Sequence, residues 1–341
     1  MRVAVFGFGA MGQRATRMLL AKGAQIVAVI DPAGDLPQRV SRVFGQAYPW
    51  PQTHAVMPEL EPMLLDVALH TFATQLVDIE PVALACAAAG VNVASIAEDA
   101  FEPFFADAHL PVALRLDSAF REARCTLLAT GVQDTFMYQM PLALISACEQ
   151  VRHVRICNIA DLSKLGPTVM QHLPINARPE DCRELCDNAL NQRFCFDVAI
   201  RPLIRRLGRT VISSHNELRL LVSEHGFYCA PLQLPIEPGC VYGLEEFTRL
   251  RLDDGSQFEL ALRPCVLGDG QQAYQRCDVD CASPISFTVE PFDGAMLTCA
   301  ALVSRALELA DAPRGFISVD QLEHPGAGSA RQPAPLMPAP L

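Results

Sequence analysis

Residues 2–12, RVAVFGFGAMG, join a short apolar stretch directly to three glycines in the spacing G-x-G-x-x-G. The β-branched and apolar residues 2–6 are typical of a fully buried parallel strand. Residues 13–23, QRATRMLLAKG, have helical spacing and end on a glycine. A second apolar run, 26–30, ends in Asp31, about 20 residues beyond the glycines. This order of strand, glycine turn, helix and acid-terminated strand predicts a dinucleotide-binding unit.

The glycines have separate physical roles in such a unit. Gly7 permits the tight turn, Gly9 lets the backbone approach a pyrophosphate, and Gly12 lets the helix pack on the strand. The helix then begins at Ala10 and Met11, whose N–H groups would face the phosphates. The alternative interpretation is a glycine-rich turn that binds no ligand.

Asp31 is predicted to accept hydrogen bonds from the hydroxyls of the adenosine ribose. This favours NAD(H), because a 2′-phosphate would meet a charge of the same sign. Arg39 and Arg42 follow close behind, and they leave NADP(H) open as an alternative cofactor.

The strand–helix alternation continues through the first half of the chain. Residues 66–72, 91–97 and 125–130 are predicted strands, and residues 81–90, 111–123 and 140–150 are predicted helices. This alternation predicts an α/β fold, a Rossmann doubly wound parallel sheet, which binds its ligands at the carboxyl ends of the strands. Predicted strand ends supply the further candidate contacts to the cofactor, Thr71, Phe72 and Gly131. His70 beside them is either a proton carrier or a structural histidine.

The second half of the chain has a different pattern of predicted strands and helices. Residues 151–162 resemble a long strand, 180–207 a helix, and 216–266 several alternating strands with Asp254-Gly255 as a hairpin turn. We expect an α+β second domain with a mostly antiparallel sheet. A further helix over 295–311 and a Pro/Ala/Gly-rich end complete the chain. The predicted boundaries are 1–133 for the dinucleotide-binding domain, 134–294 for the α+β domain, 295–323 for a C-terminal helix returning to the first domain, and 324–341 for a disordered tail.

Charge and cysteine content exclude several classes of protein. The formal net charge is −11, which argues against nucleic acid or an anionic membrane surface as a partner. No run of about 18 apolar residues predicts a membrane span. The amino terminus has no secretory pattern, and the thirteen cysteines are scattered without a C-x-x-C pair or histidines at zinc-binding spacing. We therefore expect a cytoplasmic protein without a metal site.

Several segments, taken in order, resemble a known group of enzymes. They are SIAED at 95–99, LLATGVQDTF at 127–136, DLSKLGPTVM at 161–170, and FDGAMLTCAALV with APRGFISVDQL between 292 and 322. Together with the glycine motif they are similar to 2,4-diaminopentanoate dehydrogenases and related NAD(P)H-dependent amine dehydrogenases, and more distantly to dihydrodipicolinate reductases. The resemblance implies interconversion of a carbonyl plus ammonia with an amine. It also implies a second domain that closes the pocket and supports a homodimer.

The resemblance assigns the catalytic role to Glu98. The chemistry agrees, because reductive amination needs one group that removes protons from ammonium and later protonates the departing water. A glutamate at an apolar strand end is partly desolvated, which raises its pKa toward neutrality and suits both tasks. The alternative is that Glu98 is an acid favoured at a helix start. Asp99 is interpreted as a helix-start acid or a support for Glu98.

The substrate half departs from the family pattern. Residues 133–136 read Gln-Asp-Thr-Phe where the family has Asn-Pro-Gly-Phe or Asp-Pro-Gly-Phe, and residues 158–160 lose an arginine and an asparagine. Losing the arginine disfavours a carboxylate-bearing substrate, and a small, rather apolar ketone or aldehyde is expected. The candidate pocket residues are Phe136, Tyr138, Asn158, Asp161 and Thr168.

Two other functions remain open from the sequence. One is the reduction of a preformed cyclic imine in a biosynthetic pathway, which needs no free ammonia. The other is a catalytically inactive NAD-binding regulator that kept the cofactor site while its pocket decayed; the altered segments at 133–136 and 158–160 motivate it.

Overall fold

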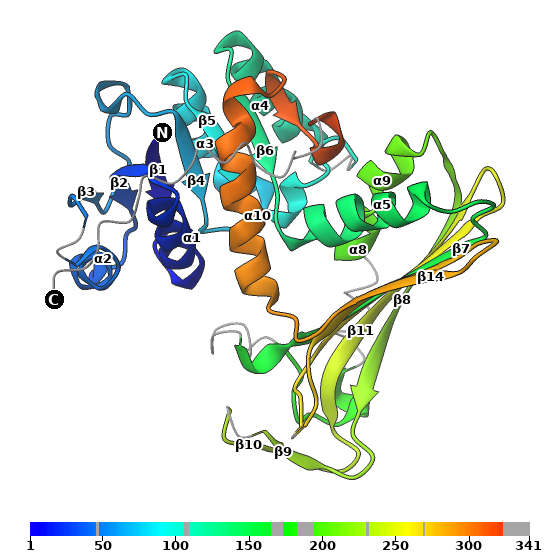
Figure 1. Ribbon diagram of the computed structural model, residues 1–341. Helices are drawn as coiled ribbons and strands as arrows, with labels where there is room; N and C mark the ends of the chain where they lie inside the picture. Colours follow the sequence, from blue (N-terminus) through cyan, green and yellow to red (C-terminus); the bar gives the residue numbers. More distant parts are fainter. Residues whose placement is uncertain are drawn as a thin grey trace, which may run out of the picture. The chain divides into compact units, whose positions relative to one another are not determined.

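The computed structural model describes residues 1–45, 48–105, 109–164, 173–182, 194–229, 232–268 and 270–322. The chain forms two compact units (Figure 1). The first comprises Met1–Thr135 together with the chain from Ala295 onward, and the second comprises Phe136–Gly294. The predicted tail, 324–341, lies outside the described residues.

The first unit contains a seven-stranded parallel sheet in the order β15-β6-β5-β4-β1-β2-β3. Its strands are β1 (Arg2–Phe6), β2 (Gln25–Ile30), β3 (Gln52–His54), β4 (Val67–His70), β5 (Asn92–Ser95), β6 (Thr126–Ala129) and β15 (Gly315–Ile317). Its helices are α1 (Ala10–Ala21), α2 (Leu36–Phe44), α3 (Leu76–Ala88), α4 (Leu110–Glu122) and α10 (Gly294–Glu308). The strand order reverses between β1 and β4, so the carboxyl ends of these strands flank a topological switch point.

The predicted fold class is confirmed, and burial explains it. Strands β4 and β6 are buried at every residue, as expected for strands covered on both faces. Helices α3 and α4 pack together over one face, where Ala83 and Leu116 join the core formed by Phe6, Ala68 and Leu127. Helix α1 packs against β1 and β2, and α2 lies beside it (Figure 1).

Helix α3 begins at Leu76, five residues before the start predicted at Pro81. The prediction was wrong because proline is favoured in a first turn, whereas here it lies inside the helix and removes one backbone donor. Leu76 and Ile79 are fully buried in the core. Their burial, worth about 1.5–3 kcal/mol each, offsets the lost hydrogen bond.

The second unit is built on a six-stranded sheet in the order β14-β13-β7-β12-β11-β8. Its strands, with the separate β9–β10 pair, are β7 (His153–Asp161), β8 (Val211–Val222), β9 (Phe227–Cys229), β10 (Leu234–Ile236), β11 (Val241–Leu252), β12 (Gln257–Cys265), β13 (Tyr274–Asp280) and β14 (Ile285–Val289). Four of the neighbouring pairs are antiparallel, and β7 and β12 are parallel. The expected hairpin joins β11 to β12, with Gly255 at φ +87° and the Ser256 hydroxyl bonded to Asp254.

The helices of the second unit are shorter than predicted. A π-helix, Asp134–Gln139, precedes α5 (Met140–Ser146), which ends four residues before the predicted position. The described part of the predicted 180–207 helix divides into the turn Pro179–Cys182, α8 (Cys195–Ala199) and α9 (Arg201–Arg206). Pro202 stands in the first turn of α9; because proline has no N–H, it favours a new helix start over continuation of α8. Within the described chain, no helix has the length and hydropathy needed to cross a bilayer.

Candidate functional site

The glycine turn after β1 is closely packed on two sides. Gly7 has a φ of +84°, and its N–H donates to the Ile30 carbonyl at 2.9 Å. A Cβ at Gly7 would lie 2.6 Å from the Cβ of Phe72. A Cβ at Gly12 would lie 2.0 Å from the Gly7 carbonyl oxygen and 2.8 Å from Thr71 Oγ1. Neither position has room for a side chain, so the turn is held close to the next strand end.

Gly9 differs, because nothing lies within 4 Å of the place where its Cβ would stand. It precedes α1 without a capping side chain, and the first turn carries no acidic residue. Among the described residues, the N–H groups of Ala10, Met11 and Gly12 have no hydrogen-bond acceptor. Open space beside free donors at a helix N-terminus fits the pyrophosphate of a dinucleotide.

Asp31, at the end of β2, is buried and fully engaged. Its oxygens accept hydrogen bonds from the N–H of Phe8 at 2.5 Å and of Ala33 at 2.9 Å. They also pair with the Arg39 guanidinium, whose Nη2 lies 2.9 Å from Oδ1. Burial alone would raise the pKa of Asp31, but the hydrogen bonds from Arg39 and the two backbone N–H groups outweigh it and lower the pKa. Arg39 also donates to the Phe8 carbonyl at 2.8 Å and pairs with Asp35 at 2.9 Å.

Thr71 and Phe72, which the sequence predicts as cofactor contacts, lie against the glycine turn. The Thr71 hydroxyl contacts the Gly7 carbonyl at 2.6 Å and the Phe6 carbonyl at 3.1 Å. Phe72 remains partly exposed. The Thr71 side chain thus links the carboxyl ends of β1 and β4, and it also lies against Gly12, the glycine at which the helix packs on the strand.

His70 is enclosed by aromatic rings. Its ring centroid lies 5.3 Å from that of Phe6 and 5.6 Å from that of Phe72, and Nε2 lies 3.9 Å from the Cys86 sulfur. Nδ1 has no hydrogen-bond partner among the described residues. Burial lowers the pKa of His70 to about 3. The imidazole is therefore neutral at physiological pH, which argues against its being a proton carrier.

Glu98 begins a three-residue 3-10 turn, Glu98–Ala100, beyond the end of β5. The Asp99 N–H donates to the Thr74 carbonyl at 3.2 Å, which ties this turn to the segment after β4. Glu98 is exposed, and its carboxyl makes no hydrogen bond to another described residue. Surrounding protein atoms and the neighbouring charge of Asp99 raise the pKa of Glu98. A single short turn has little dipole, so the helix-start interpretation explains Glu98 poorly.

Gly131 lies beyond β6, on the same edge of the sheet. A Cβ there would be 2.9 Å from Gln133 Oε1 and 3.3 Å from the methyl group of Thr298 on α10. The Thr298 hydroxyl accepts a hydrogen bond from the Val132 N–H at 3.2 Å. Thr298 was not among the predicted site residues, although it stands in the resembling segment at 292–303.

A second contact that was not predicted lies about two turns further along α10. Asp134 accepts two hydrogen bonds from Arg305, at 2.6 and 2.9 Å, and one from the Thr130 hydroxyl at 3.1 Å. Both side chains of the ion pair are buried. The sequence did contain a signal for this contact. Helical spacing over 295–311 puts Arg305 on the same buried face as Leu302 and Val303.

The predicted substrate residues that the structure describes lie in the second unit. Phe136 and Tyr138, on the π-helix, are both buried, and the Phe136 ring packs edge-on against Phe292 at 5.4 Å. Asn158 is buried on β7 and donates to the Tyr274 carbonyl. Thr168 lies outside the described residues.

Asp161, the last residue of β7, accepts hydrogen bonds from the N–H and the hydroxyl of Ser163 at 2.9 and 2.6 Å. It therefore closes a turn of the kind that short acidic side chains favour. Alternation along a strand puts Asn158 and Asp161 on opposite faces of β7. The cofactor residues thus assemble within one unit, whereas the substrate assignments remain predictions.

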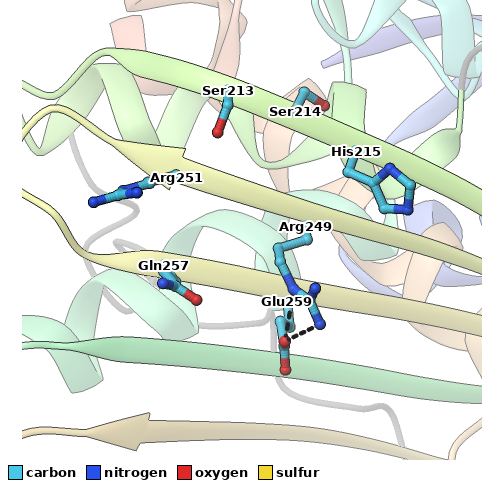
Figure 2. A pocket seen from close by; sticks show the side chains of 7 residues that line it. All are labelled: Ser213, Ser214, His215, Arg249, Arg251, Gln257 and Glu259. Atoms are coloured by element: carbon cyan, nitrogen blue, oxygen red, sulfur yellow. Dashed lines mark hydrogen bonds and ion pairs between the residues drawn. The ribbon is translucent and has the colours of Figure 1, made fainter.

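A polar depression of about 420 Å³ lies on the sheet of the second unit (Figure 2). Strands β8, β11 and β12 line it, and Figure 2 shows Arg249 bonded to Glu259 across two of them. None of the predicted site residues lines it; the lining residues are Ser213, Ser214, His215, Arg249, Arg251, Gln257 and Glu259. The described residues also contain no cluster of histidine, cysteine and acidic side chains that could hold a metal ion.

No protein-family model and no curated protein matches this chain. Solved structures do match it. An amine dehydrogenase from Mycobacterium smegmatis aligns with a TM-score of 0.82 at 24% identity, over 95% of this chain and 96% of that one. The chain shares its fold with that dehydrogenase.

Two more distant structures contain a bound cofactor. GenD2 from gentamicin A biosynthesis, in complex with NAD, has a TM-score of 0.56 at 13% identity, over 91% of this chain and 85% of that one. Biliverdin reductase from a Synechocystis species, in complex with biliverdin and NADP⁺, has a TM-score of 0.53 at 13% identity, over 94% of both chains.

Proposed function

We propose that this chain is an NAD(P)H-dependent oxidoreductase acting on C–N bonds, which interconverts a small, rather apolar ketone or aldehyde plus ammonia with a primary amine. The observation that carries the proposal is Glu98, a carboxyl with a raised pKa at the ligand edge of a parallel sheet. The free N–H groups after Gly9 support a nicotinamide dinucleotide as the second reactant. The fold shared with an amine dehydrogenase supports the same class of reaction.

The overall reaction converts one carbonyl, one ammonium ion, one proton and one hydride into one alkylammonium ion and one water. When bound, the nicotinamide supplies the hydride. Glu98, as a carboxylate, takes a proton from ammonium, and the freed nitrogen lone pair attacks the carbonyl carbon. A proton then passes from the added nitrogen to the alkoxide oxygen, which gives the carbinolamine. As a carboxylic acid, Glu98 then protonates the carbinolamine hydroxyl, which leaves as water while the C=N bond forms.

The raised pKa suits both steps. A carboxyl of ordinary pKa is a weak base and is almost wholly ionised at neutral pH, so it rarely has a proton to donate. Desolvation by the surrounding protein atoms and the charge of Asp99 raise the pKa of Glu98 above the ordinary value of a glutamate. General acid–base catalysis is worth about 10²–10⁴-fold in rate, so removing this carboxyl should cost a factor in that range.

The decisive experiment measures NADH and NADPH oxidation with a panel of small ketones and aldehydes, with and without ammonium at alkaline pH. Wild type is compared with Glu98→Gln, and Asp99→Asn serves as a matched control that removes the adjacent charge. We expect ammonium-dependent turnover in wild type and Asp99→Asn, and a loss of about 10²-fold or more in Glu98→Gln. Unchanged turnover in Glu98→Gln would remove the catalytic assignment.

The same panel separates the two other functions. Turnover of preformed cyclic imines without any need for ammonium would indicate an imine reductase. Tight binding of NADH with no turnover of any substrate would indicate a regulator.

We also propose a homodimer in which a second copy covers the face of the six-stranded sheet that carries Phe247 and Arg249. One row across this face carries charges of alternating sign on neighbouring strands, with Arg249, Glu259, Arg155 and Asp278 in register. Beside it, the Phe247 ring lies between the guanidinium groups of Arg249 and Arg219, whose centres are 5.4 and 4.6 Å from it. A face with both signs and a partly exposed aromatic can bind a copy of itself.

Light scattering after gel filtration tests this arrangement. We expect twice the chain mass of 37.1 kDa for wild type, and a shift toward the monomer for Phe247→Glu. Arg17→Glu, at an exposed position of α1, is the control and should remain dimeric. A monomeric wild type would remove the proposal.

A further inference from the structure

Two thiols of the second unit lie against one another at one end of its sheet. Cys148 stands just beyond the end of α5, and Cys281 directly follows β13. A hydrogen bond between the two side chains contributes to raising the pKa of Cys148. The adjoining backbone is tied as well, because the Ala282 N–H donates to the Glu149 carbonyl at 2.9 Å. Both cysteines are free thiols, so the fold holds two unbonded sulfurs in contact.

The packing of α5 on β13 explains this contact. Side chains alternate along a strand, so Cys277, Val279 and Cys281 point to the same face, and all three are buried. Helix α5 packs against β13, and its end brings Cys148 to this face, where its charge also acts on Cys277. The meeting of the two thiols is therefore part of the core packing of the second unit.

The two thiols differ in their access to solvent. Cys281 is 1% exposed, whereas Cys148 is half-buried and lines a depression of about 310 Å³ together with Arg209 and Phe258. A reagent of the size of a water molecule, which takes about 30 Å³, has ample room there. The pair thus combines an accessible thiol with a second thiol behind it.

A pair of cysteines in the first unit shows the contrast. Cys86 and Cys125 also lie close enough for the charge of one to raise the pKa of the other. Both are buried, at 0% and 1% exposure, so a dissolved reagent does not reach them in the folded protein. Proximity and access come together at Cys148.

We propose that Cys148 and Cys281 are an oxidisable pair, which a small hydroperoxide such as hydrogen peroxide converts into an intramolecular disulfide. The Cys148 sulfur attacks a peroxide oxygen, the O–O bond breaks, and the leaving hydroxide takes up the thiol proton as water. The Cys281 sulfur then attacks the sulfenic sulfur, the S–O bond breaks, and a second water leaves with the proton of Cys281. The two thiols together lose two electrons, and the peroxide gains them. An external dithiol reverses the step by exchange.

The surroundings of Cys148 make the first step slow. Burial and the hydrogen bond with Cys281 raise the pKa of Cys148 to about 11. The thiolate is the form that reacts, and it is a small fraction at neutral pH. The pair therefore closes under sustained oxidation and remains reduced under brief exposure.

The disulfide has a structural consequence. It closes a loop from residue 148 to residue 281, which contains strands β7 to β13. Closing so long a loop removes conformational freedom from the unfolded chain, so the oxidised protein should resist unfolding better than the reduced protein. The inference does not rest on the proposed function, because neither thiol takes part in the catalytic or cofactor assignments.

The test uses the full-length protein, reduced with dithiothreitol, freed of it, and then incubated with hydrogen peroxide. Mass spectrometry of a non-reducing digest should find the peptides of Cys148 and Cys281 joined, two hydrogens lighter than the separate peptides. The unfolding temperature should rise by at least about 4 °C and return to its starting value when dithiothreitol is added back.

Three variants assign the roles of the two thiols. Cys148→Ser should leave Cys281 unmodified, because the buried thiol is not reached. Cys281→Ser should leave Cys148 as a sulfenic acid that dimedone traps, because the accessible thiol still reacts. Both variants should lose the joined peptide and the temperature shift. Cys157→Ser removes another half-buried thiol of the second unit and is the matched control, which should keep both.

Two results would overturn the assignment. One is a wild type in which Cys148 is oxidised to sulfinic acid while Cys281 is still a free thiol, because the second sulfur then fails to intercept the first. The other is a joined peptide that links Cys148 to Cys277 and not to Cys281. Turnover and NADH binding of the reduced protein are measured separately, and their absence would bear on the proposed function and not on this pair.

Discussion

Arg305 and Asp134 lie 171 positions apart in the sequence and form a two-pronged ion pair inside the first unit, with Nε and Nη2 at 2.6 and 2.9 Å from the two carboxylate oxygens. The side chains are 2% and 0% exposed. The pair fixes the first residue of the π-helix Asp134–Gln139 to α10. It also holds the segment after Gly131, beyond the carboxyl end of β6.

Breaking one side of this pair should be costly. Arg305→Met leaves a buried, unpaired carboxylate, and we expect a loss of about 3–5 kcal/mol in the free energy of unfolding measured with urea. The double variant Asp134→Leu/Arg305→Met should recover most of it, because no charge is then stranded. Arg121→Met, which breaks an exposed pair with Asp117, is the control and should cost no more than about 1 kcal/mol. A loss that small in Arg305→Met would contradict the interpretation.

Two neighbouring glycines should respond differently to alanine. Gly9→Ala adds a methyl group in open space, so the melting temperature should stay close to that of wild type while NADH affinity falls. Gly12→Ala drives a Cβ into the Gly7 carbonyl, so both stability and affinity should fall. Thermal melts with and without NADH measure both effects. Equal melting temperatures for the two variants would contradict the packing argument.

The pH dependence of turnover should report Glu98. Its raised pKa predicts that kcat/KM for amination rises with pH through a limb above the ordinary glutamate range of about 4.3. Asp99 contributes through repulsion between like charges, so Asp99→Asn should lower the pKa and move the limb to lower pH. If the limb of the pH profile does not move in Asp99→Asn, the limb reports the titration of another group.

The ionised Glu98 carboxylate should also lower the stability of the folded state. A carboxyl whose folded pKa is raised favours the folded state while protonated, and that contribution is lost as the pH rises through the folded pKa. Glu98→Gln should therefore unfold at a higher temperature than wild type at pH 8, and the difference should vanish near pH 4. Thermal melts across this range measure it, and a difference independent of pH would argue against a raised pKa.

His70 should not titrate near neutrality. With a folded pKa of about 3, its imidazole signals in NMR should stay constant between pH 5 and 8. The unfolded chain takes up this proton below about 6.5, so His70 contributes stability that is complete above pH 6.5 and is lost as the pH falls from there toward 3. His70→Leu should flatten this acid limb of the stability profile. Titration of His70 near its ordinary pKa would show that its surroundings are more polar than they appear in the fold.

The parts of the fold that could be predicted depend on local pattern. The strand, turn, helix and second strand of residues 2–31 could be predicted, because glycine spacing and apolar runs act over a few residues. The same argument put Thr71 and Phe72 at the next strand end, where the structure has them against Gly7. The position of Glu98 after β5 follows for the same reason, while its catalytic role remains a proposal.

Contacts that depend on three-dimensional packing could not be predicted. The sequence indicates only that Arg39 is a cation close to Asp31 along the chain. Its ion pair with Asp31 depends on the angle at which α2 leaves the sheet. The partnership of Arg305 with Asp134 joins segments that have no local relation. Asn158 was predicted from a segment that departs from the family pattern and Asp161 from a resembling one, and the two-residue period of a strand puts their side chains on opposite faces of β7.

Strand β15 has a consequence for how the molecule is made. Its neighbour β6 pairs with a segment that is synthesised much later. The Thr126 hydroxyl donates a hydrogen bond to the Pro313 carbonyl, 187 positions further along the chain. At about 5–20 residues per second on the ribosome, this delay is roughly 10–40 s. The whole second unit therefore emerges before the first can complete its sheet, and during translation the β6 edge is an open strand that must be kept from pairing with other chains.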